Sequence, residues 1–156
     1  TNDAVGTIER LEDIGVEPYL IATALRAVIS QRLVRRICPK CKKSYEATDE
    51  EVRRLGLSTG HKHIFYRGEG CADCFNTGYR GRIGVFEILE ITPEIRPLIS
   101  QQAGRPAIEE ELASDRSDFR TLRENAIELV ESGITTAEEV QRVIYETGDM
   151  KTAEEE

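Results

Sequence analysis

The stretch that decides the fold of this chain is Cys38-Pro39-Lys40-Cys41, together with a second Cys-x-x-Cys turn at Cys71-Ala72-Asp73-Cys74. The 156 residues contain no other cysteine. Four thiolates in two such turns can converge on one tetrahedral ion, and zinc suits that donor set best. The turns lie further apart than the about 15–20 residues of a compact four-cysteine finger, so we expect the segment between them to carry its own structure. The expected zinc ligands are Cys38, Cys41, Cys71 and Cys74.

These cysteines could instead form disulfide bonds, remain free thiols or bind a catalytic metal. The first ten residues, TNDAVGTIER, show no basic-then-apolar secretion signal, and thiols stay reduced in the cytosol. Both points disfavour disulfides. A catalytic zinc keeps one coordination position open, whereas four cysteines fill the shell. For the same reason we interpret His61 and His63 as exposed loop histidines rather than as spare ligands.

The composition is that of a folded, acidic chain. There are 21 lysines and arginines against 29 aspartates and glutamates, which gives a net charge of −8, and 39% of the residues are hydrophobic. Aliphatic residues occur throughout, which disfavours wholesale disorder. No apolar run reaches the roughly 18–20 residues that span a bilayer. The acidic total also disfavours indiscriminate binding of nucleic acid, which needs a basic surface.

Apolar periodicity predicts a chain that is mostly helical. The predicted helices cover residues 4–14, 18–36, part of 45–56, a segment that begins at Thr92-Pro93, 105–113, 118–132 and 136–147. β-Branched and aromatic residues predict strands over 63–67 and 82–90. The predicted fold class is therefore α+β, with a small sheet that joins the two metal-binding turns.

The sequence also makes specific predictions for the helix ends and the C-terminus. Three arginines would lie in the last turn of the helix 18–36, where cations complement the negative end of the helix dipole; a phosphate- or partner-binding role is the alternative. They are Arg32, Arg35 and Arg36. Thr136 and Glu139 have the spacing of a capping box. For the charged residues 149–156 we expect a disordered acidic tail.

No catalytic motif is complete within these 156 residues. The sequence has neither the GxxxxGK[ST] phosphate loop nor a GxGxxG motif. No cysteine is left as a nucleophile once four bind a metal, and neither histidine has a persuasive serine or aspartate partner in the sequence. The residues alone therefore indicate a zinc-stabilised, helix-rich interaction or structural module rather than a self-sufficient enzyme.

Several stretches resemble, in the same order, the C-terminal part of the type II secretion and type IV pilus assembly ATPases. These stretches are TNDAVG (1–6), RL (10–11), GVEP (15–18), AVISQRLVRRICPKC (27–41), CADC (71–74), GYRGRIGVFEIL (78–89), TLR (121–123) and GITTAEEV (133–140). The resemblance covers about residues 1–145. Such a combination is far more specific than two Cys-x-x-Cys turns.

This resemblance implies part of a cytoplasmic, hexameric, RecA-like ATPase that works at the periphery of the inner membrane. Residues 1–37 would be the last helices of the RecA-like core, 38–82 the tetracysteine zinc subdomain, and 83–148 a strand plus a C-terminal helical subdomain. The phosphate loop and Walker B strand of the family lie upstream of residue 1. ATP and magnesium would thus belong to the full-length parent, and we expect a fragment that does not hydrolyse ATP alone.

The resemblance also implies partners and a nucleotide contact. The partners would be an inner-membrane platform protein and the neighbouring subunits of the hexamer, and the tetracysteine segment favours secretion or pilus assembly over retraction. Arg80 and Arg82 are the candidates for the base side of the nucleotide site, because a guanidinium can stack on a planar base. The alternative is that both pair with acidic neighbours or offset the charge of the zinc thiolates.

A free-standing zinc-ribbon adaptor that binds nucleic acid or protein is a function of a different class. Its basic cluster would be Arg35, Arg36, Lys40, Lys42 and Lys43, and aromatic side chains would stack on bases. These aromatic residues would be Phe65, Tyr66 and Tyr79. The net charge of −8 and the lack of an interleaved basic and aromatic pattern along one element argue against this function, so we expect no nucleic-acid partner.

Overall fold

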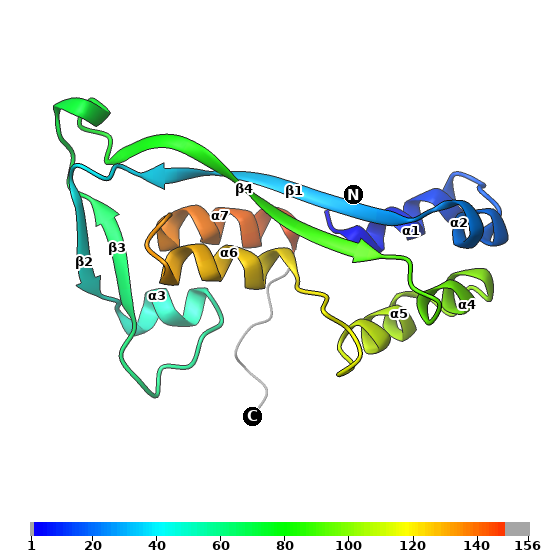
Figure 1. Ribbon diagram of the computed structural model, residues 1–156. Coiled ribbons are helices and arrows are strands. Elements are labelled where there is room, and N and C mark those ends of the chain that lie inside the picture. The colour runs from blue at the N-terminus through cyan, green and yellow to red at the C-terminus, as the bar shows by residue number, and fades with distance from the viewer. Residues whose placement is uncertain (1, 149–156) are drawn as a thin grey trace. The chain divides into compact units, whose positions relative to one another are not determined.

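The computed structural model describes residues 2–148 and divides the chain into two compact units (Figure 1). Unit 1 combines the residues up to 31 with residues 86–122, and unit 2 combines residues 32–85 with those from 123 on. Two long strands, β1 (Ala27–Ile37) and β4 (Tyr79–Glu90), pair with each other, and each contributes residues to both units. The resemblance predicted three segments, 1–37, 38–82 and 83–148. The two compact units have other bounds, so this division stays a prediction.

Unit 1 packs short helices around an aliphatic core. Its helices are α1 (Ala4–Asp13), α2 (Pro18–Ala24), α4 (Ile95–Ser100) and α5 (Arg105–Leu112). Isoleucines dominate the core: Ile8, Ile95 and Ile99 are each at most 2% exposed. Burial of such side chains stabilises a fold by about 1.5–3 kcal/mol each. The apolar periodicity of the sequence is therefore the main determinant of this unit.

Two carboxylates connect distant segments of unit 1. Asp3 caps α1 and also pairs with Arg105 on α5 at 2.8 Å. Glu87 is 4% exposed and accepts hydrogen bonds from the main-chain amides of Ala4 and Leu122 at 2.7 and 2.8 Å. Buried carboxylates are tolerated where donors satisfy them, so Glu87 fixes both segments to β4.

Unit 2 contains a second two-stranded sheet, helices and the cysteine turns. Strands β2 (Lys42–Glu46) and β3 (Ile64–Gly68) are antiparallel, with Lys42 opposite Gly68. Helix α3 (Asp49–Arg54) follows β2 and begins with a complete capping box between Thr48 and Glu51. Helices α6 (Leu122–Glu131) and α7 (Ala137–Thr147) lie side by side (Figure 1).

The α+β class is confirmed for the part of the chain that the structure describes, which has seven α-helices and two two-stranded sheets. The prediction that the chain is mostly helical is wrong for these residues, because fewer than half of them lie in α-helices. The helices predicted near 4–14, 105–113 and 136–147 and both predicted strands are present within a few residues. None of the helices in residues 2–148 is long and apolar enough to cross a bilayer. The tail predicted over 149–156 lies outside the described residues.

The predicted helix over residues 18–36 is wrong in its second half. Helix α2 ends at Ala24, and strand β1 begins three residues later. Ile29 and Leu33, two apolar residues of β1, are 63% and 51% exposed. The β-branched residues of this stretch favour a strand, but its partner β4 is far along the chain, where local periodicity cannot reveal it. The arginines at 32, 35 and 36 therefore do not complement a helix dipole.

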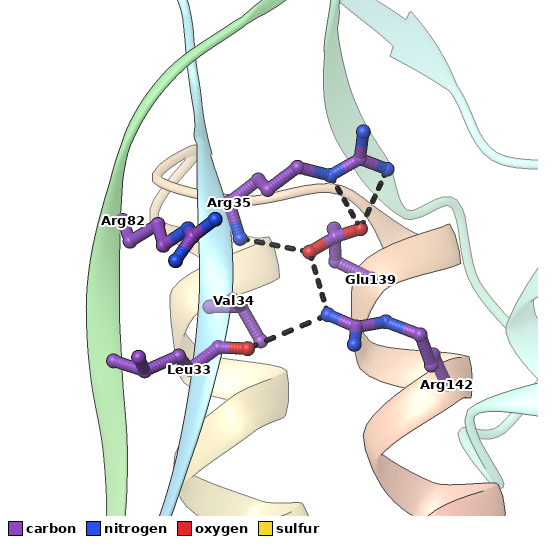
Figure 2. A pocket seen from close by; sticks show the side chains of 6 residues that line it. All are labelled: Leu33, Val34, Arg35, Arg82, Glu139 and Arg142. Atoms are coloured by element: carbon purple, nitrogen blue, oxygen red, sulfur yellow. Dashed lines mark hydrogen bonds and ion pairs between the residues drawn. The ribbon is translucent and has the colours of Figure 1, made fainter.

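Glu139 is the buried carboxylate that connects α7 to β1 (Figure 2). Its side chain is 3% exposed and accepts from the Arg35 amide at 2.8 Å, from Arg35 Nε at 2.9 Å and from Arg142 at 3.1 Å. Burial opposes ionisation, but the hydrogen bonds from Arg35 outweigh it and lower the pKa of Glu139. The expected capping box is thus half present. Thr136 accepts from the Glu139 amide, whereas the carboxylate binds arginine.

Replacing Glu139 by alanine should destabilise the chain by about 2–3 kcal/mol, because hydrogen bonds to charged groups contribute about 1.5–3 kcal/mol. The Arg35 amide would also lose its partner. Glu138→Ala is the matched control, since Glu138 is the exposed neighbour on the same helix and should contribute less than about 1 kcal/mol. Urea unfolding followed by circular dichroism measures both. Equal losses in the two variants would contradict this role of Glu139.

Candidate metal centre

The first Cys-x-x-Cys turn joins the end of β1 to the start of β2. Cys38 directly follows β1 and Cys41 directly precedes β2; the two are 0% and 8% exposed. The Cys38 amide donates to the Gly78 carbonyl at 2.9 Å. This hydrogen bond fixes the first turn to the segment that follows the second turn.

The second turn is a short 3-10 helix, η1 (Ala72–Cys74), that leads into β4. Three main-chain amides point at sulfur. Those of Cys71 and Gly78 donate to Cys74 Sγ at 3.2 and 3.3 Å, and that of Gly70 donates to Cys41 Sγ at 3.3 Å. Hydrogen bonds to a charged form favour that form, so these turns are built to hold thiolates.

The four sulfur atoms form one cluster, in which all lie within 4.8 Å of one another. The Sγ atoms of Cys38 and Cys71 are 3.8 Å apart, those of Cys41 and Cys74 are 3.9 Å apart, and those of Cys71 and Cys74 are 3.7 Å apart. A disulfide has a sulfur–sulfur distance of about 2.05 Å, and all four cysteines are free. A tetrahedral ion with bonds of about 2.3 Å to sulfur places its ligands about 3.8 Å apart. The cluster therefore has the size of a four-thiolate metal site.

The thiols differ in how readily they ionise. Burial raises the pKa of the Cys74 thiol, but the amides of Cys71 and Gly78 outweigh it and bring that pKa down to about 6. Burial raises the pKa of the Cys41 thiol to about 11, in spite of its hydrogen bond from Gly70. Metal binding needs deprotonated cysteines and releases their protons. Cys74 is thus the cysteine that ionises most readily of these two, and binding of an ion would have to release the proton of Cys41.

Two backbone segments, at Gly68 and at Gly78, cross closely next to the sulfur cluster. A Cβ atom at Gly68 would lie 2.2 Å from the Gly78 carbonyl oxygen, and one at Gly78 would lie 2.5 Å from that of Gly68. Gly78 also has a φ of +77°, which favours glycine. Both positions therefore need glycine for the second turn to reach β3. This crossing was not predicted from the sequence, where the only signal is a glycine near each end of the second turn.

The histidines between the two turns lie outside the sulfur cluster. His63 Nε2 is 2.8 Å from the Ser58 carbonyl oxygen, and its ring centre is 4.5 Å from that of His61. In residues 2–148 the group of close metal-ligating side chains consists of the four cysteines and includes no histidine. Both histidines lie in the loop between the turns, as expected, but only His61 is exposed, whereas His63 is half-buried.

Arg80 and Arg82 are exposed residues of β4. Arg82 lines a pocket of about 380 Å³ beside the network of Arg35, Glu139 and Arg142 (Figure 2), and Arg80 lines another of about 400 Å³. Within the described residues the side chain of neither arginine has an ion pair or a hydrogen bond. Pairing with acidic neighbours is therefore not observed there, and the role on the base side of a nucleotide stays a prediction.

Several residues of the proposed nucleic-acid adaptor are already engaged. Phe65 is fully buried. The Tyr79 ring lies 4.0 Å from the Arg35 guanidinium, and its hydroxyl contacts the Thr136 hydroxyl at 2.9 Å. Arg35 in turn binds Glu139. These side chains cannot stack on bases without rearrangement, which weighs against this alternative.

Comparison with known proteins agrees with the resemblance in the sequence. The type II secretion system ATPase E of Vibrio cholerae is 41% identical, over 94% of this chain and 29% of its own length. The type II secretion system protein E of Dickeya dadantii is 40% identical, over 94% of this chain and 28% of its own length. The type IV pilus assembly ATPase PilB of Thermus thermophilus is 45% identical, over 90% of this chain and 16% of its own length.

The chain thus spans less than a third of the length of these relatives. Residues 1–142 match the family described as Type II/IV secretion system protein. This match covers most of the chain and includes both cysteine turns. The chain therefore belongs to the type II/IV secretion system protein family.

Proposed function

We propose that this chain is the zinc-binding C-terminal part of a hexameric ATPase that powers type II protein secretion or type IV pilus assembly. The observation that carries the proposal is the four-sulfur cluster in a chain that matches the family over residues 1–142. Relatives of both kinds match at comparable identity, 41% and 45%. The proposal therefore covers both machines.

The proposed ion is zinc, in a structural role. Thiolates are soft donors, and closed four-sulfur sites are typical of structural zinc. When bound, the ion would supply a cross-link whose binding free energy adds to the stability of the fold. Cys38 follows β1, and the turn that ends at Cys74 precedes β4. The ion would therefore hold the adjoining ends of these two paired strands together.

ATP hydrolysis would depend on residues that this chain does not contain. The sequence has no phosphate loop that could cradle the β- and γ-phosphates of ATP or hold magnesium. We infer that the full-length parent binds ATP and magnesium and that this chain alone is inactive. The relatives named as ATPases, of which the chain covers 29% and 16%, support this inference.

The proposed location is the cytoplasmic periphery of the inner membrane. The proposed partners are an inner-membrane platform protein and the neighbouring subunits of the hexamer. Family membership supports both assignments. The tetracysteine segment 38–82 would be a docking element, because hydrogen bonds hold its turns and their tips, such as Lys40 and Phe75, are exposed.

Cys71→Ser should remove most of the zinc from the purified chain and expose residues 38–82 to protease, because three thiolates no longer complete the shell. His63→Ala is the matched control and should keep one zinc ion per chain. Native mass spectrometry and limited proteolysis measure the two properties. Full zinc occupancy and unchanged protease resistance in Cys71→Ser would refute the four-cysteine site.

Gly78→Ala should lower zinc affinity about 10–100-fold, as is typical when the residues that support metal ligands are changed. The added Cβ would collide with the Gly68 carbonyl and displace the amide that donates to Cys74 Sγ. Gly81→Ala is the control, because Gly81 has nearly the same φ, +78°, but open space around its Cβ position. Competition with a chromogenic zinc chelator gives both affinities. Equal affinities would mean that the crossing does not support the metal.

Alanine at Arg80 or Arg82 should weaken ATP binding by the full-length parent about fivefold, which corresponds to about 1 kcal/mol of cation–π energy. Arg53→Ala on α3 is the control for the loss of one exposed cation. Equilibrium binding of a fluorescent ATP analogue measures the effect. Unchanged affinity in both variants would exclude the nucleotide role and leave the proposed zinc site unaffected.

A further inference from the structure

The charges of this acidic chain are distributed unevenly. Among residues 2–148, unit 1 has 13 acidic and 6 basic side chains, whereas unit 2 has 12 acidic and 14 basic side chains. A basic surface attracts acidic partners, whereas the acidic surface of the rest of the protein repels them. The positive side chains of unit 2 that lack internal partners are therefore candidates for recognition.

A pocket of about 400 Å³ beside the first cysteine turn gathers such side chains. Three cations from three strands line it: Arg36 of β1, Lys42 of β2 and Arg80 of β4. The remaining lining residues are uncharged: Ile37, Pro39, Gly133 and Ile134. The pocket thus has three positive charges and no carboxylate among its lining residues.

In residues 2–148, two cations of this pocket lack a side-chain partner, and the third lies over an aromatic ring. Within the part of the chain that the structure describes, the side chains of Arg36 and Arg80 have no ion pair or hydrogen bond. The Lys42 ammonium lies 4.8 Å from the centre of the Tyr66 ring. A Cβ at Gly133 would lie 2.8 Å from Lys42 Nζ and 2.9 Å from the Tyr66 ring, so the absence of a side chain at Gly133 leaves room for this arrangement. Lys42 is therefore positioned before any partner arrives.

The walls of the pocket favour carboxylates on a protein segment over a phosphate group. Phosphate sites usually present free main-chain amides, but those of Ile37, Gly133 and Ile134 already donate to main-chain carbonyls at 2.9–3.0 Å. The aliphatic side chains of Ile37 and Ile134 instead suit an apolar residue. Pockets of roughly 300–1,000 Å³ that combine an apolar wall with a few polar groups are typical ligand sites.

We propose that Arg36, Lys42 and Arg80 form a docking pocket for a partner protein, which inserts a segment with acidic side chains next to an aliphatic one. This proposal specifies which kind of partner segment would bind, and it rests on the docking role proposed above for the tetracysteine segment 38–82. Salt-sensitive, charge-guided docking would steer the partner to unit 2 and away from the acidic unit 1.

Fluorescence anisotropy with a short fluorescein-labelled peptide of alternating glutamate and leucine tests this proposal on the zinc-loaded 156-residue chain. We expect binding that weakens as salt rises and that falls at least tenfold in Arg36→Ala/Lys42→Ala. Arg53→Ala/Arg54→Ala removes the same charge from α3, outside the pocket, and should bind like the wild type. A peptide of alternating lysine and leucine should not bind.

Absence of binding at low salt, or equal affinities for the two double variants, would overturn the proposal. It would also be overturned if inorganic phosphate or phosphatidylglycerol vesicles bound more tightly than the acidic peptide with the same dependence on Arg36 and Lys42, since the pocket would then recognise phosphate. Zinc content and circular dichroism of every variant show whether the fold is intact. A normal zinc content with no peptide binding would reject this pocket and leave the proposed zinc site standing.

Discussion

The convergence of four cysteine sulfurs within 4.8 Å of one another is the constraint on which unit 2 depends. Cys38 directly follows β1 and Cys74 comes shortly before β4, so the cluster brings together the adjoining ends of two strands that are paired with each other. The amides that point at sulfur and the contact between Gly68 and Gly78 are arranged around this point. A metal ion held by these sulfurs would thus be coupled to the geometry of both strands through a few residues.

Four arginines of unit 2 fall into two groups with different consequences. Arg35 and Arg142 satisfy the buried carboxylate of Glu139 and so attach α7 to β1. Arg36 and Arg80 have no such partner within the described residues and lie with Lys42 around a pocket. The first group contributes to stability, because a buried carboxylate needs donors. The second group contributes nothing visible to the fold, which is why it is the better candidate for recognition.

The sequence predicted the parts of this structure that depend on local pattern or on chemically specific residues. The cysteine spacing predicted the sulfur cluster, and apolar periodicity predicted helices such as α1 and α7. The errors arose where a distant partner decides the outcome. The stretch 27–37 has a helical pattern but pairs with β4, and Glu139 has capping-box spacing but binds Arg35. Both partners, β4 for the stretch 27–37 and Arg35 for Glu139, lie far away in the sequence, so local sequence patterns cannot predict these contacts.

The most direct test of this account is X-ray absorption spectroscopy at the zinc edge of the chain, purified with its metal. We expect one zinc ion with four sulfur neighbours at about 2.3 Å and no nitrogen or oxygen in the first shell. A shell that contains nitrogen or oxygen, or fewer than four sulfurs, would contradict the closed four-cysteine site and the structural role assigned to it.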